Sequence, residues 1–482
     1  MKNNRLFNRT ATIALIAGDA VAFLVAFGLT LAIYNAFGGE KDTFENFTYS
    51  HYFFVFVFPI ILYAFLRRGH YTRREPWWSE VRFIFFSLIT AFFIDVSARI
   101  LYQVPLLDII ICGVWILAFA FVLIGRQLVC FGLKKCGIWD IDTILIGKAD
   151  TVIDLLYAFH ADYYTGYKVQ KIILRDRKDA DFDISLIPAP YRDVEIINDP
   201  QAYKAAIEDS SDHYYVIDFD TFRGDARDAL IQDLGRKNIL YSVVPPINSM
   251  RLFEMRPQNF FGYDIMLLQS RNVSDNLVGK FTKRLIDLVV ATIAIITLSP
   301  VFLIVAICQK KEGQGGSLFY GGERIGKDGV KFKCWKFRSM EPDSDHLFQA
   351  LLESDDQIKS DWDKFQKLKV DDPRVQTKTS RLMRKTSIDE LPQLWNVIKG
   401  DMSLVGPRPI LESEIPLFGS SFDNYIQVRP GVTGLWQVSG RNDTSFERRV
   451  YMDNWYVRNR SIWGDITILF KTIMVVLKGS GM

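Results

Sequence analysis

Four apolar stretches in the first quarter of the chain constrain its fold most strongly, because each is long enough to cross a bilayer. They run roughly over residues 11–36, 47–66, 83–101 and 106–124. The first is too long for the apolar part of a secretory signal peptide. Apolar residues also make up 49% of the 482 residues. The sequence therefore predicts a membrane protein that begins with a four-helix transmembrane bundle.

The loops between these stretches predict the orientation of the bundle. Basic residues precede the first stretch, fill the second loop and follow the fourth stretch: Lys2, Arg5, Arg9, Arg67, Arg68, Arg73, Arg74, Arg82, Arg126, Lys134 and Lys135. The first and third loops lack such an excess. Because basic loops stay on the cytoplasmic side, both ends of the bundle are expected in the cytoplasm of a bacterial inner membrane.

Three charged residues lie within or at the ends of these stretches, namely Asp19, Asp95 and Arg99. Charges inside a membrane are functional candidates, but pairing between helices or snorkelling explains them equally well.

Residues 142–272 change in character and predict a Rossmann-like domain. Short apolar runs at 143–147, 214–218 and 239–244 alternate with helical patterns, as in a parallel sheet. Only Gly147 follows the first run, so the glycine fingerprint of dinucleotide-binding domains is missing. Tyr164 and Lys168 match a short dehydrogenase pattern, which chance explains better. We expect a structural or regulatory domain, with nucleotide sensing as one option.

A fifth apolar run, residues 285–309, is interrupted near its middle by Ser299 and Pro300. Basic residues flank it on both sides, and proline removes a hydrogen bond from the helix. Two basic flanks favour a re-entrant helix hairpin that enters and leaves on the cytoplasmic face. A kinked fifth span is the alternative, and it would place the rest of the chain outside the cytoplasm.

The cysteines and the net charge exclude several classes of protein. The five cysteines form no CxxC pair, which argues against a disulfide framework or a zinc site. A net charge of +3 gives no argument for a nucleic-acid partner.

From residue 277 to 482 we expect a third domain after the bundle (1–135) and the middle domain (142–272). Residues 341–368 are rich in charge and predict helices. Residues 456–477 combine apolar and basic side chains, as amphipathic helices at a membrane interface do, although core helices fit equally well.

Two adjacent carboxylates, Asp389 and Glu390, are the strongest chemical signal in that domain. Ser387 and Glu390 match a capping box, whereas Pro392 fits better if Asp389 is the cap. Either reading predicts a helix that ends at Gly400, whose N-terminal dipole keeps Asp389 ionised and favours phosphate.

Cationic residues in stiff or extended segments surround the pair. Lys336 and Arg338 are two residues apart on an expected strand, so they share a face. Further arginines stand beside proline or glycine: Arg408, Arg429 and Arg441. Arginine forks suit phosphate oxygens. Together these residues predict a diphosphate site in which Mg²⁺ lets the carboxylates and the phosphates coexist.

These motifs, from about residue 283 onward, resemble the bacterial sugar transferase family, the monotopic polyprenol-phosphate phosphoglycosyl transferases. The matching segments are Arg284-Leu-Ile-Asp287, Ser299-Pro300, Lys336-Phe-Arg338-Ser-Met340, Asp372-Pro-Arg374, residues 386–394, residues 399–409 and Arg429-Pro-Gly-Val-Thr-Gly434. The whole chain is similar to the large four-span members that begin O-antigen or capsule repeat units. Thr379-Ser380 departs from the family, which commonly has a glycine there.

The resemblance implies a two-step reaction between a UDP-sugar and undecaprenyl phosphate. Asp389 would attack the β-phosphorus and release UMP, and undecaprenyl phosphate would then take the phosphosugar. It also implies Glu390 as the Mg²⁺ ligand and Arg338, Arg408 and Arg429 as phosphate or uridine ligands. Overall resemblance favours galactose over glucose, and the layout suggests a homodimer among membrane lipids.

Two other classes remain as alternatives. A membrane-bound nucleotide-sugar dehydratase would need the missing dinucleotide fingerprint and would leave Asp389 unexplained. A non-catalytic scaffold for polysaccharide assembly would have no use for the carboxylate pair.

Overall fold

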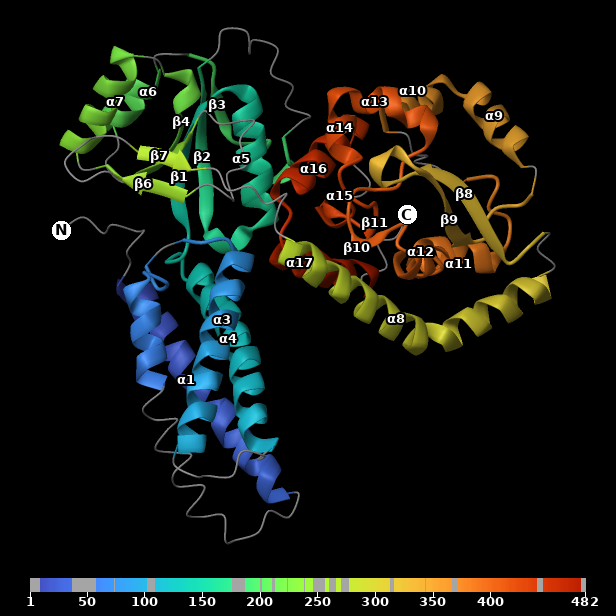
Figure 1. Cartoon of the computed structure of the whole chain (residues 1–482). Coiled ribbons are helices and arrows are strands. Elements are labelled where there is room, and N and C mark those ends of the chain that lie inside the picture. Colours follow the sequence, from blue (N-terminus) through green and yellow to red (C-terminus); the bar gives the residue numbers. More distant parts are fainter. Residues whose placement is uncertain are drawn as a thin grey trace. The chain divides into compact units, whose positions relative to one another are not determined.

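The computed structural model describes most of the chain and divides it into two compact units, Met1–Asn248 and Ser249–Met482. The described residues are 9–36, 58–72, 74–101, 109–175, 187–199, 202–209, 213–222, 224–237, 239–245, 256–259, 266–269, 277–312, 316–342, 344–365, 372–439 and 445–477. The two units of Figure 1 are described separately.

Long apolar helices form the first part of unit 1. They are α1 (Arg9–Ala36), a short helix at Phe58–Arg67, α3 (Trp77–Leu101) and α4 (Ile109–Lys135). Among the described residues, three segments are long and apolar enough to cross a membrane: Arg9–Thr30, Gly113–Lys135 and, in unit 2, Val278–Glu312. Residues 47–57 and 106–108 of the predicted spans lie outside the described residues. Apolar helices that could cross a membrane are thus confirmed, while the four-helix transmembrane bundle stays a prediction.

A buried cluster of charges joins these helices. Arg126 of α4 is 1% exposed and contacts both Asp19 of α1 and Glu80 of α3. Its Nε and Nη2 atoms donate to the two oxygens of Asp19, at 3.0 and 2.6 Å. The Tyr71 hydroxyl also donates to Asp19, at 2.8 Å. Asp19 is therefore paired between helices, and Arg126, expected as a basic residue after the fourth span, lies inside the helix packing.

A five-stranded parallel sheet forms the second part of unit 1, as predicted. Its order is β3-β2-β1-β4-β5, and its strands are Ile141–Gly147 (β1), Tyr167–Leu174 (β2), Glu195–Ile197 (β3), Tyr214–Asp218 (β4) and Tyr241–Val244 (β5). Its helices are α5 (Ala149–Ala161), α6 (Ala202–Asp209) and α7 (Asp225–Arg236). Tyr164 is buried against Trp139 and Trp77 while Lys168 is exposed, so the dehydrogenase pattern is not a site.

Helix α8 (Leu277–Glu312) dominates the start of unit 2 and passes through Pro300 without ending. It bends along its length (Figure 1). Its first part donates from Arg284 to the carbonyls of Val397 and Ile398, at 2.8 and 3.0 Å. Its last part donates from Gln309 to the carbonyl of Arg338, at 2.6 Å. Both ends of the helix are therefore fixed to the same folded unit.

Strands and further helices make up the rest of unit 2. Its strands are β6 (Arg256–Asn259), β7 (Met266–Gln269), β8 (Phe319–Ile325), β9 (Lys331–Phe337), β10 (Ser403–Val405) and β11 (Gly431–Thr433). Its helices are α9 (Asp345–Ser354), α10 (Asp356–Phe365), α11 (Lys378–Thr386), α12 (Gln393–Lys399), α13 (Ile415–Phe418), α14 (Phe422–Tyr425), α15 (Leu435–Ser439), α16 (Phe446–Asn459) and α17 (Ile462–Leu477). The charge-rich segment predicted to be helical, residues 341–368, contains α9 and α10.

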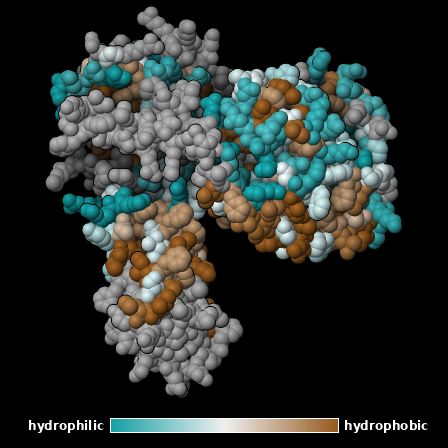
Figure 2. Space-filling view, in the orientation of Figure 1, coloured by the Kyte–Doolittle hydropathy of each residue, from teal (hydrophilic) through white to brown (hydrophobic). Residues whose placement is uncertain are grey.

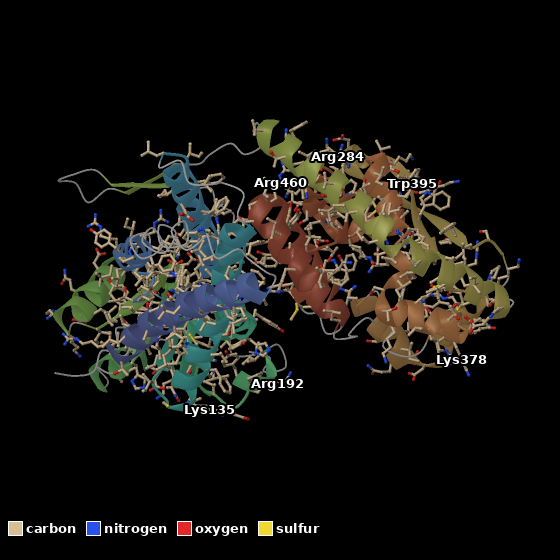
Figure 3. The ribbon with its side chains drawn as sticks, turned by 90° about the horizontal axis from the view of Figure 1, so that it is seen from below. Lys135, Arg192, Arg284, Lys378, Trp395 and Arg460 are labelled. Carbon is tan, nitrogen blue, oxygen red and sulfur yellow. The ribbon has the colours of Figure 1, made fainter. Side chains whose placement is uncertain are left out.

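One face of unit 2 is strongly apolar. Figure 2 shows a hydrophobic surface along the side of this unit where Figure 1 places α8 and α17. Exposed side chains on these helices include Ile293, Ile296, Leu303, Phe470 and Ile473. Trp395 of α12 is 59% exposed and lies beside α8, the helix that carries Arg284 (Figure 3). Exposed apolar area of this extent is typical of a surface that contacts a membrane or a protein.

Candidate active site

Asp389 lies in a tight turn between two helices. Helix α11 ends at Thr386, and Ser387 adopts a left-handed backbone conformation with φ of 58°. A 3₁₀ turn, Ile388–Glu390, then leads into α12, which ends at Gly400 as predicted. The predicted caps are wrong: the Ser387 side chain caps nothing, and the residue before α12 is Pro392. The backbone already follows a helical path from residue 388 to 391, so no extended residue remains to act as a side-chain cap.

The turn brings Glu390 to Lys336 of β9, and leaves Asp389 buried at 9% exposure. The Nζ atom of Lys336 lies 2.7 Å from Oε1 of Glu390, and both side chains are about one third exposed, at 32% and 30%. The structure thus joins three of the predicted site residues, two carboxylates and one cation. They are inside the fold but reachable from its surface.

Burial shapes the protonation of this trio. Burial, together with the charge of Glu390, raises the pKa of Asp389 to about 6, although the charge of Lys336 lowers it. Burial opposes the charge of Lys336, yet Glu390 and Asp389 together raise its pKa above the usual value. Near pH 7 Asp389 is therefore mainly ionised and Lys336 is charged. Desolvation raises the pKa of Asp389 by more than the helix dipole expected at this position lowers it.

A second ion-pair cluster supports the turn from α11. Arg374 binds both oxygens of Asp372, each at 2.9 Å, and Arg384 approaches the same carboxylate at 3.3 Å. These arginines hold the pKa of Asp372 below its usual value, although burial alone would raise it. Arg384 also lowers the pKa of Asp389. The Asp-Pro-Arg motif therefore fixes α11 and places an additional cation near the trio.

Arg408 follows β10 on a loop that glycines hold close to the segment leading into β11. Strands β10 and β11 pair in parallel, Ser403 with Gly431 and Val405 with Thr433. A Cβ added at Gly406 would lie 2.5 Å from the Arg429 carbonyl oxygen, and one at Gly431 would lie 2.1 Å from the Gly406 nitrogen. Only glycine permits this approach.

The other predicted cations do not join the trio. β9 ends at Phe337, so Arg338 leaves the strand and donates to the Ser317 carbonyl at 2.9 Å. Arg429 donates to the carbonyl of Gly400 at 2.7 Å, which places it at the far end of α12 from Asp389. Arg441 lies outside the described residues. Ser299 donates to Ile296 within α8, so it and Pro300 mark a bend rather than a site.

Sequence reasoning missed a polar cluster on α15 and α16. Arg449 and Asp453 are buried and stand beside Trp436, next to the Arg408 loop. Burial raises the pKa of Asp453 to about 8. In the sequence, Arg449 and Asp453 are one helical turn apart, which would have suggested an ordinary surface ion pair.

The carboxylates fit Mg²⁺ only in one mode. Within the described ranges, no group of three or more His, Cys, Asp or Glu side chains could hold a metal ion. Mg²⁺ bound to substrate phosphates commonly uses one or two protein carboxylates. Glu390 is about one third exposed and already faces a cation, so it suits this mode of binding. It does not suit a metal site made of protein ligands alone.

Comparison with known proteins places this geometry in a family. Residues 278–479 match the model of the family described as bacterial sugar transferase. Across 97% of both chains, the sequence is 35% identical to a UDP-galactose-lipid carrier transferase of Erwinia amylovora. It is 36% identical to the undecaprenyl-phosphate galactose phosphotransferase of Salmonella typhimurium, over 86% of this chain and 85% of that one.

A shorter relative matches less than half of this chain. The exopolysaccharide production protein ExoY of Sinorhizobium fredii is 47% identical over 42% of this chain and 89% of its own. The family match therefore rests on the unit that holds Asp389, and full-length relatives extend it through the apolar helices and the parallel sheet. The chain belongs to the bacterial sugar transferase family.

Proposed function

We propose that the protein transfers galactose 1-phosphate from UDP-galactose to undecaprenyl phosphate, as the first step of O-antigen or capsule repeat-unit assembly. The observation that carries this proposal is the trio of Asp389, Glu390 and Lys336, set in a matched family domain. The names of two long relatives supply the sugar and the lipid carrier. Transfer of glucose 1-phosphate from UDP-glucose is the alternative.

In the first step, a carboxylate oxygen of Asp389 attacks the β-phosphorus of the donor. The bond between that phosphorus and the bridging oxygen breaks, and the electron pair leaves with UMP. Asp389 is suited to this role because it is ionised near pH 7 but poorly solvated, which leaves its oxygens available. Lys336 holds Glu390 and offsets the negative charge that the diphosphate brings.

In the second step, a phosphate oxygen of undecaprenyl phosphate attacks the phosphorus held on Asp389. The aspartyl oxygen leaves as a carboxylate, so the enzyme is regenerated without a net proton change at Asp389. Glu390 would hold Mg²⁺, which neutralises phosphate charge when bound. Arg408 would supply a further cation for the substrate phosphates.

The lipid substrate requires Asp389 to work near the membrane surface. Support comes from α8, which is 36 residues long and would extend about 54 Å if straight. Its bend and its attachment at both ends to one unit favour a re-entrant helix on the cytoplasmic side. The exposed apolar side chains of α8 and α17, with Trp395, would lie in the bilayer interface.

Covalent labelling tests the proposal. Purified full-length protein in lipid nanodiscs is incubated with UDP-galactose or UDP-glucose radiolabelled in the sugar, with Mg²⁺ and without undecaprenyl phosphate. We expect label on the protein that hydroxylamine releases, more from UDP-galactose, and none on the Asp389→Asn variant.

A matched control removes a carboxylate elsewhere in the same unit. Glu412 forms an exposed pair with Lys331, so Glu412→Gln should be labelled like the wild type. Label that persists in Asp389→Asn would refute the nucleophile. Label only from UDP-glucose would refute the sugar and leave the chemistry standing.

A further inference from the structure

Two guanidinium groups and one carboxyl group gather around the indole ring of Trp436. The Arg449 guanidinium carbon lies 4.7 Å from the ring centre, and that of Arg408 lies 5.9 Å from it. Asp453, one helical turn after Arg449 on α16, accepts the backbone N–H of Arg408 at 3.4 Å. Arg449, Asp453 and Trp436 are 5%, 4% and 6% exposed.

Several polar atoms of this cluster lack a partner in the described part of the protein. They are Nε and Nη2 of Arg449, Nε1 of Trp436 and Oδ1 of Asp453, all fully buried. Arg449 and Asp453 form no ion pair with each other or with any other described residue, despite their spacing. Buried polar groups are nearly always hydrogen-bonded, so a concentration of unpaired donors indicates a place where a ligand supplies the acceptors.

The charges of the cluster select an anion. Burial and the neighbouring charge of Arg408 lower the pKa of Arg449 to about 10. The pKa of Asp453, raised to about 8 by burial, leaves that group mainly protonated near neutral pH. Two cations thus face one largely neutral acid, and the net positive charge calls for a negative ligand with several acceptor oxygens.

The cluster adjoins the trio at Asp389 through the buried thiol of Cys334. Burial raises the pKa of this thiol; Lys336, Arg324 and Arg408 lower it, and Glu390 raises it. Cys334 and Lys336 are two residues apart on β9, so they lie on the same face of this strand. An anion between Arg408 and Arg449 would be next to the phosphate that Asp389 attacks.

We propose that Arg449, together with Arg408, binds the phosphate of the leaving nucleotide, UMP. This inference rests on the proposed function, in which the breaking bond leaves its electron pair on an α-phosphate oxygen. The negative charge that develops on the α-phosphate needs hydrogen-bond donors on the side away from Asp389. On the Asp389 side, Lys336 and Glu390 already serve the β-phosphate. Asp453 keeps the Arg408 backbone in place and acts as a positioning residue.

Binding of the product tests the inference directly. UMP and uridine are titrated calorimetrically into full-length protein in nanodiscs, for the wild type, Arg449→Gln and Arg448→Gln. Arg448 is the matched control because it is the adjacent residue of α16 but stacks on Tyr451 instead of Trp436. We expect Arg449→Gln to weaken UMP binding roughly tenfold to hundredfold, as loss of charge-assisted hydrogen bonds does, and to leave uridine binding unchanged. Arg448→Gln should bind UMP like the wild type.

Each other outcome has a defined meaning. Equal UMP affinity in folded Arg449→Gln would overturn the inference, because water then satisfies the buried donors. If Arg449→Gln bound UMP normally and Asp389 was also labelled normally, the inference would be wrong and the proposed function would still hold. A wild type that binds no UMP would overturn both.

A measurement on the wild type covers the case in which Arg449→Gln does not fold. In hydrogen exchange, UMP should protect the amides of α16 (Phe446–Asn459), and uridine should not. No protection by UMP, or equal protection by both, would overturn the inference.

Discussion

Each unit of the protein places two carboxylates beside one cation, yet the two clusters differ in how completely the cation is used. In unit 1, Arg126 is almost fully enclosed and bonds to both Asp19 and Glu80. In unit 2, Lys336 remains one third exposed and, among the described residues, bonds to Glu390 alone and leaves Asp389 without an ion pair.

This difference separates structure from chemistry. A guanidinium fork that satisfies two carboxylates fixes three helices and has nothing left for a substrate. An ammonium group that holds one carboxylate can still attract a phosphate, and the second carboxylate is free to react. The comparison predicts that loss of the cation affects folding in unit 1 and activity in unit 2.

The largest expected effect is on the stability of unit 1. Arg126→Met would leave Asp19 and Glu80 buried without their cation, which should cost about 3–5 kcal/mol of folding free energy. The measurement is thermal unfolding of the protein in nanodiscs. The control is Lys135→Met, an exposed cation on the same helix, which should unfold like the wild type.

Neutralising the carboxylates should rescue part of this loss. In the triple variant Arg126→Met, Asp19→Asn, Glu80→Gln, the buried charges are gone, so the melting temperature should recover toward the wild type. A single Arg126→Met variant as stable as the wild type would break the comparison.

The next effect is on catalysis in unit 2. Lys336→Met should lower the rate of Asp389 labelling about 100-fold, as loss of one electrostatic contact to the reacting group does. The melting temperature should change little, because Lys336 is partly exposed and bonds to one carboxylate only. Lys331→Met, a change at an exposed position of the same strand, should label at the wild-type rate. Unfolding of Lys336→Met would make the two clusters equivalent.

The smallest effect is on pH dependence. Because Asp389 must be ionised to attack and its pKa is raised to about 6, labelling should rise with pH and reach half its maximum near pH 6. Lys336 lowers this pKa, so in Lys336→Met the residual activity should have its midpoint at higher pH. The measurement is the initial labelling rate across pH 5 to 8. A midpoint that stays in place, or moves down, would contradict the electrostatic role of Lys336.

Sequence patterns predicted the elements of this protein better than their contacts. Apolar length predicted α1 and α4, and short apolar runs predicted β1 and β4, because these signals lie within each segment. The sequence also predicted that Asp389, Glu390 and Lys336 belong to one site, because phosphate transfer needs both signs of charge.

The errors concern residues whose role depends on distant partners. Arg126 looked like a basic residue at a membrane boundary, but it is buried and forms ion pairs with two carboxylates of other helices. Arg338 and Arg429 stay predictions as phosphate ligands; in the structure they donate to the backbone carbonyls of Ser317 and Gly400. Arg449 and Asp453 have the spacing of an ordinary surface ion pair, and only the folded structure shows that both side chains are buried.

The close approach of Gly406 and Gly431 has a consequence for engineering donor specificity. Because no side chain fits between these backbones, the segment with Arg408 and the segment with Arg429 can shift only together. A chimaera that takes one of these segments from a relative and keeps the other would place two unmatched backbones at a distance that tolerates no adjustment. The two segments should therefore be exchanged as a pair, and they should also vary as a pair among natural members of the family.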